Sequence, residues 1–292
     1  MHVRIIVNPI AGAGKGLVRA EELRRELASR GATAEILVTQ RKGDAQREAA
    51  RPGADCVVSV GGDGSANEVA NGLRGSAALM AILPLGTANV VARELRLPSK
   101  PRELAALIGQ RSVRAVDAGI ILGRRFLLGA GAGLDAAVID EVHARRGAHL
   151  SLAAYVRPVA RTVWHYAYPP VRVLTDGRLV CEDAVYVVVG NCRFSAAVFP
   201  VTPEARLDDG LLDVCVFRDL TISKIIRLAA ASWRKGFAHR KDLYYTQARA
   251  IRLEPASDAP VPFQVDGDPA DGLPASIAVE PAALRIIAPP MS

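Results

Sequence analysis

Apolar runs and helical patterns alternate along roughly the first hundred residues. Four short apolar runs predict buried strands, at residues 3–7, 34–38, 56–60 and 80–83. Helical patterns lie between them and begin near Leu17, Asp44 and Ser65, and a last one ends at Leu95. The first of these helices places apolar side chains on one face, at Ala20, Leu23 and Leu27. The alternation predicts an α/β fold in which helices cover a parallel sheet.

Beyond about Val113 the rhythm changes, because strand-like segments follow one another at shorter intervals. They lie at residues 171–175, 184–190, 211–217, 248–254 and 263–268. Helical patterns interrupt them at roughly 136–162 and 220–236. This half of the chain is therefore predicted to be mostly β and sandwich-like.

These patterns predict three parts of the chain. We expect an α/β N-terminal domain over residues 1–118, a β-rich C-terminal domain over 119–280, and a terminal strand within 281–292. The strand is the apolar run at 284–289, which fits either sheet and can return to the first domain.

Composition narrows the class of protein. No apolar run reaches the length of a transmembrane helix, and the apolar stretch at 5–7 is too short for a signal peptide, so we expect a cytoplasmic location. The four cysteines form no C-x-x-C pair, and H-E-x-x-H does not occur. The sequence therefore suggests neither a zinc site nor a cysteine nucleophile.

The net charge of +7 comes entirely from the first part of the chain. There are 19 Lys and Arg against 12 Asp and Glu up to Arg125, and 18 against 18 after it. Such an excess suits nucleic acid, a phosphorylated ligand or an anionic membrane. Aromatic residues make up only 5% of the chain and no nucleic-acid motif is present, so we expect no nucleic-acid partner.

Three glycine-containing turns follow predicted strands and lead into predicted helices. They are NPIAGAGKG (8–16), GGDGS (61–65) and PLGTAN (84–89). In an open α/β sheet, ligands bind outside the carboxyl ends of the strands, where helix N-termini offer backbone N–H groups to phosphate. Three such turns at one edge predict a phosphate cradle. The first turn matches neither the Walker A loop nor the G-x-G-x-x-G fingerprint.

The motifs together resemble the catalytic domain family of diacylglycerol kinases. The resemblance rests on Asn8-Pro9, on residues 61–68, and on Pro84 to Asn89, and it continues through Gly190-Asn191, residues 207–214 and Asp266-Gly267. This superfamily includes bacterial lipid kinases and sphingosine kinases and is related to NAD kinases. It implies an ATP-dependent kinase that uses Mg²⁺ and phosphorylates a hydroxyl of a membrane lipid.

The resemblance also implies roles for individual residues. The nucleotide contacts fall on Asn8, Pro9, Ile10, Ala11, Gly12, Thr39, Gly62, Asp63, Gly64, Ser65, Ala66, Asn67, Glu68 and Thr87. Asp63 is expected to act at the metal–phosphate centre. Ser65 stands where the family usually has threonine and keeps the hydroxyl.

A carboxylate near the γ-phosphate is expected to accept the proton of the lipid hydroxyl. The family uses the glutamate of D-G-E, and Asp268 of Asp266-Gly267-Asp268 stands at that position here. Asp266 is the competing base, since both carboxylates share one face if the segment is extended.

A second Mg²⁺ site is implied in the β-rich domain, around the D-G-L stretch. It would be formed by Asp209 and the backbone of Leu211, with Arg206 nearby through water. The alternative is a solvated turn with acidic residues.

Two segments suit a membrane surface. Residues 220–241 contain Lys224, Arg227, Arg234, Lys235, Arg240 and Lys241 and no acid, opposite an apolar face with Trp233. Residues 145–168 mix arginines with aromatic and aliphatic side chains and suit the lining of an entrance for a lipid chain. The alternative is a helix packed on the β domain for the first segment and a core role for the second.

We therefore expect a cytoplasmic kinase that associates peripherally with the membrane. Diacylglycerol is the first candidate for its substrate. Sphingoid-base or ceramide-type lipid kinase, NAD kinase and non-catalytic nucleotide-binding membrane sensor are the alternatives, in that order. A homodimer is left open.

Overall fold

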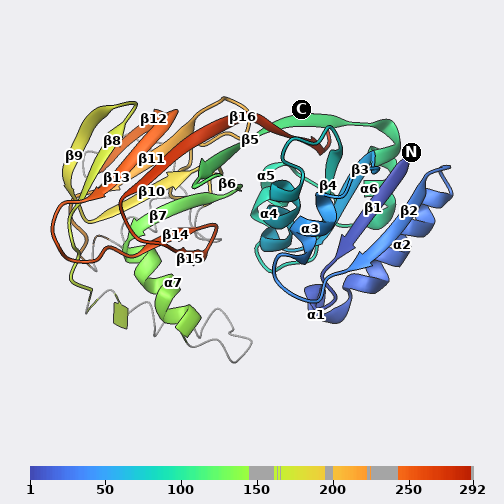
Figure 1. Ribbon diagram of the computed structural model, residues 1–292, viewed down its shortest axis with the longest axis horizontal. Coiled ribbons are helices and arrows are strands. Elements are labelled where there is room, and N and C mark those ends of the chain that lie inside the picture. Colours follow the sequence, from blue (N-terminus) through green and yellow to red (C-terminus); the bar gives the residue numbers. More distant parts are fainter. Residues whose placement is uncertain are drawn as a thin grey trace. The chain divides into compact units, whose positions relative to one another are not determined.

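The computed structural model describes residues 1–144, 161–162, 164, 166–194, 200–221, 224 and 243–290 (Figure 1). The chain forms two compact units. One consists of Met1–Ala118 and Glu280–Ser292, and the other of Gly119–Val279.

The sheet of the first unit is parallel. Its strands lie in the order β2 (Thr33–Val38), β1 (His2–Val7), β3 (Cys56–Gly61), β4 (Leu79–Pro84) and the end of β16 (Ala275–Ile287). All six residues of β3 are buried, because helices cover both faces of the sheet. Such a strand reads as a continuous apolar run rather than as an alternation. Ile286 of β16 pairs with Met80 of β4, so the terminal strand lies in the first sheet.

Two layers of helices cover this sheet (Figure 1). One layer is α2 (Gly16–Ala28) and α6 (Pro101–Gln110), which bury Leu23, Leu27, Leu104 and Ile108 against the strands. The other is α3 (Asp44–Ala49), α4 (Asp63–Gly72) and α5 (Val90–Glu94), and a short turn, α1 (Ala11–Gly14), precedes α2. No expected element covered α6, which begins at a proline in its first turn, a favourable position for proline.

The second unit is a β-sandwich. One sheet contains the start of β16, β13 (Ala250–Pro255), β8 (Val171–Thr175) and β9 (Arg178–Ala184), with β5 (Val113–Ile121) and β6 (Arg124–Phe126) at its side. The other has the order β12 (Tyr244–Ala248), β11 (Leu212–Phe217), β10 (Tyr186–Gly190), β7 (Gly129–Gly133), β14 (Phe263–Val265) and β15 (Asp268–Ala270). The core between them includes Phe126, Phe263, Leu212 and Leu253.

The predicted combination of a parallel α/β part and a mostly antiparallel β sandwich is confirmed. Strands β5, β6 and β7 match none of the predicted segments, and β9 and β12 overlap them by one residue each. The helix α7 (Leu134–Ala144) packs on β7, β14 and β15 and covers the start of the helix expected at 136–162. Most of the helix expected at 220–236 lies outside the described residues. Among the residues that are described, no helix is long and apolar enough to cross a membrane.

Candidate active site

The three glycine turns of the first unit meet at the carboxyl edge of the parallel sheet. The Leu85 N–H donates to the Gly61 carbonyl at 2.8 Å, and the Asn8 N–H donates to Val60 at 3.1 Å. Gly62 and Gly86 touch, since a Cβ built on Gly86 would lie 2.5 Å from the Cα of Gly62. Only glycines permit this contact between two loops. The parallel strands thus bring together loops that lie far apart in the sequence.

The first loop folds back on its own backbone. The Ile10 N–H donates to Oδ1 of Asn8 at 3.2 Å, which forms an Asx turn over Pro9. Ala11 follows, and Gly12 takes a φ of 60° and packs against Leu85 of the third loop. Thr39 joins the same edge, because its N–H and its hydroxyl both donate to the Val7 carbonyl.

The second loop leads directly into α4. Gly62 is extended and caps the helix, and a Cβ on Gly61 would lie 2.6 Å from Oγ of Ser65. Gly64 is exposed and has no protein atom within 4 Å of a built Cβ, so space remains above it. Ala66 is buried, and its side chain belongs to the core.

Asp63 opens α4 and lies against the first residues of α5. Its Oδ1 accepts a hydrogen bond from the Val91 N–H at 3.3 Å. Burial raises the pKa of Asp63, while backbone N–H groups of Asn89, Val90 and Val91 oppose that shift. The carboxylate is thus held in place at the meeting point of the second and third loops.

Three other residues predicted to contact nucleotide have different surroundings. The carboxylate of Glu68 accepts from the N–H groups of Gly43 at 2.9 Å and Ala45 at 3.2 Å, at the start of α3. Oδ1 of Asn67 accepts from the Asn71 side chain at 2.8 Å. Thr87 is exposed on the third loop. In this arrangement Glu68 supports the site by fixing α3 rather than by facing the loops.

The structure separates the two candidate bases of the second unit. Asp266 and Gly267 form a two-residue turn between β14 and β15, with φ values of 52° and 82°. The carboxylate of Asp266 accepts from the N–H groups of Leu127, Leu128 and Gly129 at 2.9, 2.8 and 3.1 Å. The carboxylate therefore stabilises the turn between β6 and β7 by accepting these hydrogen bonds. The segment is not extended, so the condition under which both carboxylates share a face does not hold.

Asp268 follows that turn as the first residue of β15. It pairs with Val265 across the hairpin and is half-buried. The hairpin and the fixed carboxylate of Asp266 together set the position of its backbone. The role of Asp268 as proton acceptor stays a prediction.

Asp135, at the start of α7, is a carboxylate that the sequence analysis missed. Nε2 of Gln264 donates to its Oδ2 at 3.0 Å, and the Ala136 N–H donates to Oδ1 at 2.7 Å. Burial raises the pKa of Asp135 to about 6. A Cβ on Gly131 would lie 2.2 Å from Oδ2 of Asp135, so the glycine makes room for the acid. The signal in the sequence was the stretch GAGAGLD, 129–135.

The residues of the implied second Mg²⁺ site lie in one turn before β11. The guanidinium of Arg206 pairs with Asp208 at 3.2 Å, and the Leu211 N–H donates to Oδ1 of Asp209 at 3.0 Å. The described part of the chain contains no group of three or more His, Cys, Asp or Glu that could hold a metal. A cation here would have one carboxylate and a backbone carbonyl as protein ligands, and the site stays a proposal.

Asp213 lies close to this turn. It is buried, and it accepts from the Tyr245 hydroxyl at 2.6 Å and from Nε2 of Gln247 at 3.2 Å. Burial raises the pKa of Asp213 to about 6, and the negative charges of Asp209 and Glu204 add to the shift.

Most of the basic segment at 220–241 lies outside the described residues. Lys224 is described, and its ammonium pairs with Asp219. Its charge is therefore matched by an acid. Most of residues 145–168 also lie outside, but Trp164 is described and is 73% exposed.

Comparisons with known proteins match both units. Residues 2–121 match the family model of the diacylglycerol kinase catalytic domain, and residues 129–288 match the YegS C-terminal NAD kinase beta sandwich-like domain. A probable YegS-like lipid kinase of Pseudomonas aeruginosa is 32% identical, covering 95% of this chain and 91% of its own length.

Further relatives match this chain over nearly its whole length. A diacylglycerol kinase of Mycobacterium tuberculosis is 28% identical over 98% of this chain and 95% of its own. The crystal structure of a putative diacylglycerol kinase from Bacillus anthracis superposes with a TM-score of 0.79 at 26% identity, covering 99% of this chain and 95% of that one. The chain is thus a kinase that belongs to the family of diacylglycerol kinases and YegS-like lipid kinases.

Proposed function

We propose that this kinase transfers the γ-phosphate of ATP to a hydroxyl of a membrane lipid, with diacylglycerol as the first candidate. The observation that carries the proposal is the meeting of three glycine turns at one sheet edge, with the contact between Gly62 and Gly86 at its centre. Phosphoryl transfer depends mostly on positioning and on charge neutralisation, which backbone N–H groups and helix N-termini supply. The second unit would bind the lipid.

The first unit fits a nucleoside triphosphate. The open space above Gly64 lets phosphate approach the first turn of α4, which has ten residues and an N-terminal dipole end. The Asx turn at Asn8 and the positive φ of Gly12 shape the loop beside it. Asn8 to Gly12, Thr39, Gly62 to Ser65 and Thr87 remain our proposed nucleotide contacts. Ala66, Asn67 and Glu68 would support them from behind.

Mg²⁺ fits beside Asp63. A magnesium ion in a nucleotide site usually takes one or two carboxylates and completes its shell with phosphate oxygens and water. Asp63 is a single carboxylate whose Oδ1 is already fixed by Val91, which orients the group. The ion would neutralise phosphate charge when bound.

We assign to Asp268 the role of accepting the proton of the lipid hydroxyl. Asp266 is engaged by three backbone N–H groups, which leaves it a structural role. Asp135 is the alternative acceptor, because Gln264 holds its carboxylate beside β14 of the same hairpin and burial raises its pKa to about 6. Peripheral association with the membrane follows from a lipid substrate.

One experiment tests the reaction itself. The protein is incubated with labelled ATP and Mg²⁺ in mixed micelles of a total lipid extract, and the labelled product is identified. We expect a phosphorylated lipid, and parallel reactions with purified diacylglycerol, sphingosine and ceramide identify the acceptor. Label in NADP with NAD as acceptor would assign an NAD kinase. Nucleotide binding without any transfer would contradict the proposal and favour a sensor.

A further inference from the structure

Three hairpins of the second unit have the same two-residue turn, but one of them has an unexpected residue. The turns are Leu122-Gly123, Asp176-Gly177 and Asp266-Gly267, and the first residue of each has a φ between 47° and 52°. Turns of this kind strongly favour Asn-Gly or Asp-Gly, because both central residues need a positive φ. Two hairpins follow the rule. The β5–β6 hairpin places a leucine there, in a backbone region that is unfavourable for bulky side chains.

The leucine gains nothing from the core in return. Leu122 is 83% exposed at the tip of its hairpin. The strained turn costs the folded protein free energy, and an exposed apolar side chain recovers none of it by burial. The side chain is therefore available for a contact with a surface outside the described residues.

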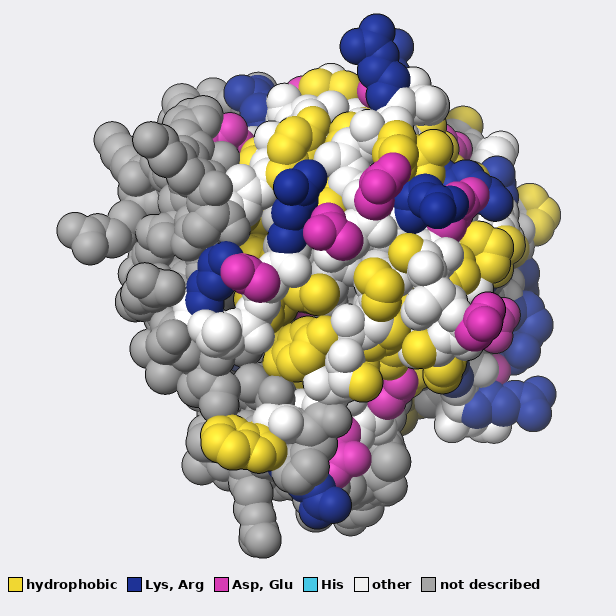
Figure 2. Space-filling view, turned by 90° about the vertical axis from the view of Figure 1, so that its left-hand side faces the viewer, with side chains coloured by type: hydrophobic (Ala, Val, Ile, Leu, Met, Phe, Trp, Pro, Cys, Tyr) yellow, Lys and Arg dark blue, Asp and Glu magenta, His cyan; other side chains and the backbone are white. Residues whose placement is uncertain are grey.

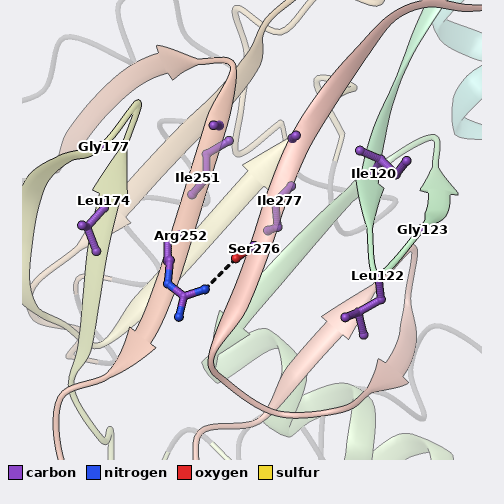
Figure 3. A pocket seen from close by; sticks show the side chains of 11 residues that line it. Ile120, Leu122, Gly123, Leu174, Gly177, Ile251, Arg252, Ser276 and Ile277 are labelled. Atoms are coloured by element: carbon purple, nitrogen blue, oxygen red, sulfur yellow. Dashed lines mark hydrogen bonds between the residues drawn. The ribbon is translucent and has the colours of Figure 1, made fainter.

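Leu122 lies at the edge of an apolar groove. The groove has a volume of about 500 Å³ and lies between the β5–β6 hairpin and strands β8, β13 and β16 (Figure 3). Ile120 and Leu122 line one side and Leu174 lines the other (Figure 3), and Ala250 of β13 also belongs to the lining. Leu179, which pairs with Leu174, is 46% exposed beside it. On the face of the second unit that Figure 2 shows, hydrophobic side chains lie among scattered charges.

The charges of the groove are mainly positive. Arg252 is the charged residue of its lining, and its guanidinium donates to Oγ of Ser276 at 2.7 Å (Figure 3). Arg252 and Arg172 share one acid, Glu254, at 2.9 and 3.6 Å, so one positive charge is left over.

The two hairpins beside the groove add to this excess. Arg124 and Arg178 are exposed and directly follow its glycines, Gly123 and Gly177. The acid of the second hairpin, Asp176, accepts hydrogen bonds from the N–H groups of Arg249 and Ala250. An apolar strip bordered by arginines is complementary to an anionic lipid surface.

We infer that the β5–β6 hairpin and this groove form a docking surface for an anionic phospholipid bilayer. Leu122 would enter the acyl region, and Arg252 with its neighbours would bind the lipid phosphates. The inference rests on the proposed lipid kinase activity, since an enzyme with a bilayer substrate needs such a surface. None of the residues that line the groove is one to which we assign nucleotide binding or proton transfer.

The test is cosedimentation of the full chain with vesicles of phosphatidylcholine alone or with added phosphatidylglycerol. We expect binding to require the anionic lipid. Leu122→Asn should lower the partition coefficient about tenfold, as the loss of one buried leucine implies. Arg252→Gln should lower it about fivefold. Leu122→Asn also introduces the favoured Asn-Gly turn, so its thermal midpoint should be equal to or higher than that of wild type.

Two variants serve as matched controls. Val113→Ser removes an apolar side chain that is 36% exposed and outside the groove lining, and Arg218→Gln removes an arginine that is paired with Asp183. Both should bind vesicles like wild type. Wild-type binding by Leu122→Asn and Arg252→Gln, or equal binding of wild type to neutral and anionic vesicles, would overturn the inference.

An assay of kinase activity on lipid in detergent micelles distinguishes a failure of the docking surface from a failure of the proposed lipid kinase activity. Leu122→Asn should keep it, because a micelle presents the lipid without a bilayer. If wild type phosphorylates no lipid, the proposed activity fails, while the vesicle result still decides whether the docking surface exists.

Discussion

The two units build their candidate sites from different parts of the polypeptide. In the first unit the loops meet through backbone, as at Gly62 and Gly86, and Asp63 is the acid that lies where they meet. In the second unit the groups of interest are carboxylates in protein surroundings, namely Asp135, Asp213 and Asp266. The first arrangement suits the binding of a charged nucleotide. In the second, the fixed carboxylate of Asp266 holds the hairpin that carries Asp268, the proposed proton acceptor.

The difference also decides what each unit tolerates. Backbone N–H groups at a helix start are supplied by any sequence that forms the loop, so only the glycines that permit contact are restricted. A buried carboxylate depends on its particular partners, since an unmatched charge or donor in the interior is costly. Substitutions in the loops of the first unit should therefore change mainly nucleotide affinity and turnover. Substitutions of buried carboxylates in the second unit should change mainly stability.

The largest expected effect concerns Asp268. Asp268→Asn should lower kcat about 10²–10⁴-fold, because the lipid hydroxyl loses its proton acceptor. Asp268→Glu restores the residue usual in the family and should stay active. Steady-state kinetics at saturating ATP measure both. An Asp268→Asn variant as active as wild type would reassign the base, and Asp135→Asn would then be the variant to examine.

Removing the charge of Asp63 tests the metal–phosphate centre proposed in the first unit. Asp63→Asn should lower kcat about 10²–10³-fold, because the metal–phosphate centre loses its negative group. Since burial already raises the pKa of Asp63, the neutral amide should leave the thermal midpoint unchanged or higher. Activity within a few-fold of wild type would remove Asp63 from the site.

Asp266 tests the structural role of a carboxylate. Asp266→Asn keeps a residue that accepts a positive φ but places an amide against three N–H donors. We expect a loss of about 2–4 kcal/mol in the free energy of unfolding, measured in urea. The matched control is Asp176→Asn, in the same kind of turn, where an exposed carboxylate accepts from two N–H groups and a smaller loss is expected. Equal losses would show that the turn rather than burial sets the cost.

Asp213 provides a pH test. Its pKa is about 6 in the folded protein, above the usual value of 3.8, so the folded state binds the proton more tightly than the unfolded state. Its contribution to stability is therefore full below about pH 4 and is lost as the pH rises through 6. Asp213→Asn should remove on the order of 2 kcal/mol of this pH dependence, as seen in urea titrations at pH 4.5 and 7.5. An unchanged pH dependence would contradict the raised pKa.

The sequence predicted the first unit well, because its signals are local. Each strand was a continuous apolar run, and each loop stood between a strand and a helix, as at Gly61 to Ser65. The helix α6 was the exception. What the sequence did not show was the direction of individual side chains. Glu68 lies within the same motif as Asp63 but binds the start of α3.

Less of the second unit could be predicted from the sequence, because its important contacts join residues that are far apart in the chain. Asp266 binds the N–H of Leu127, 139 residues earlier, and Asp135 meets Gln264 across 129 residues. Neither contact has a local pattern. The short strand β7 is made only of glycine and alanine, so hydrophobic periodicity did not reveal it, although Gly131 makes the room that Asp135 needs.

The division of labour between the units is tested most directly by calorimetric titration of ATP into Gly64→Ala and Asp268→Asn. Beyond its two chain neighbours and the backbone of its own helix, a methyl group on Gly64 meets no protein atom within 4 Å, and it favours the helix, so we expect it to interfere with a ligand above α4. Gly109→Ala in α6 is the control with a similar gain in helix propensity. We predict that Gly64→Ala raises the Kd for ATP about tenfold, while Asp268→Asn and Gly109→Ala leave it unchanged. Unaltered ATP affinity in Gly64→Ala, with a loss of affinity in Asp268→Asn, would contradict the account.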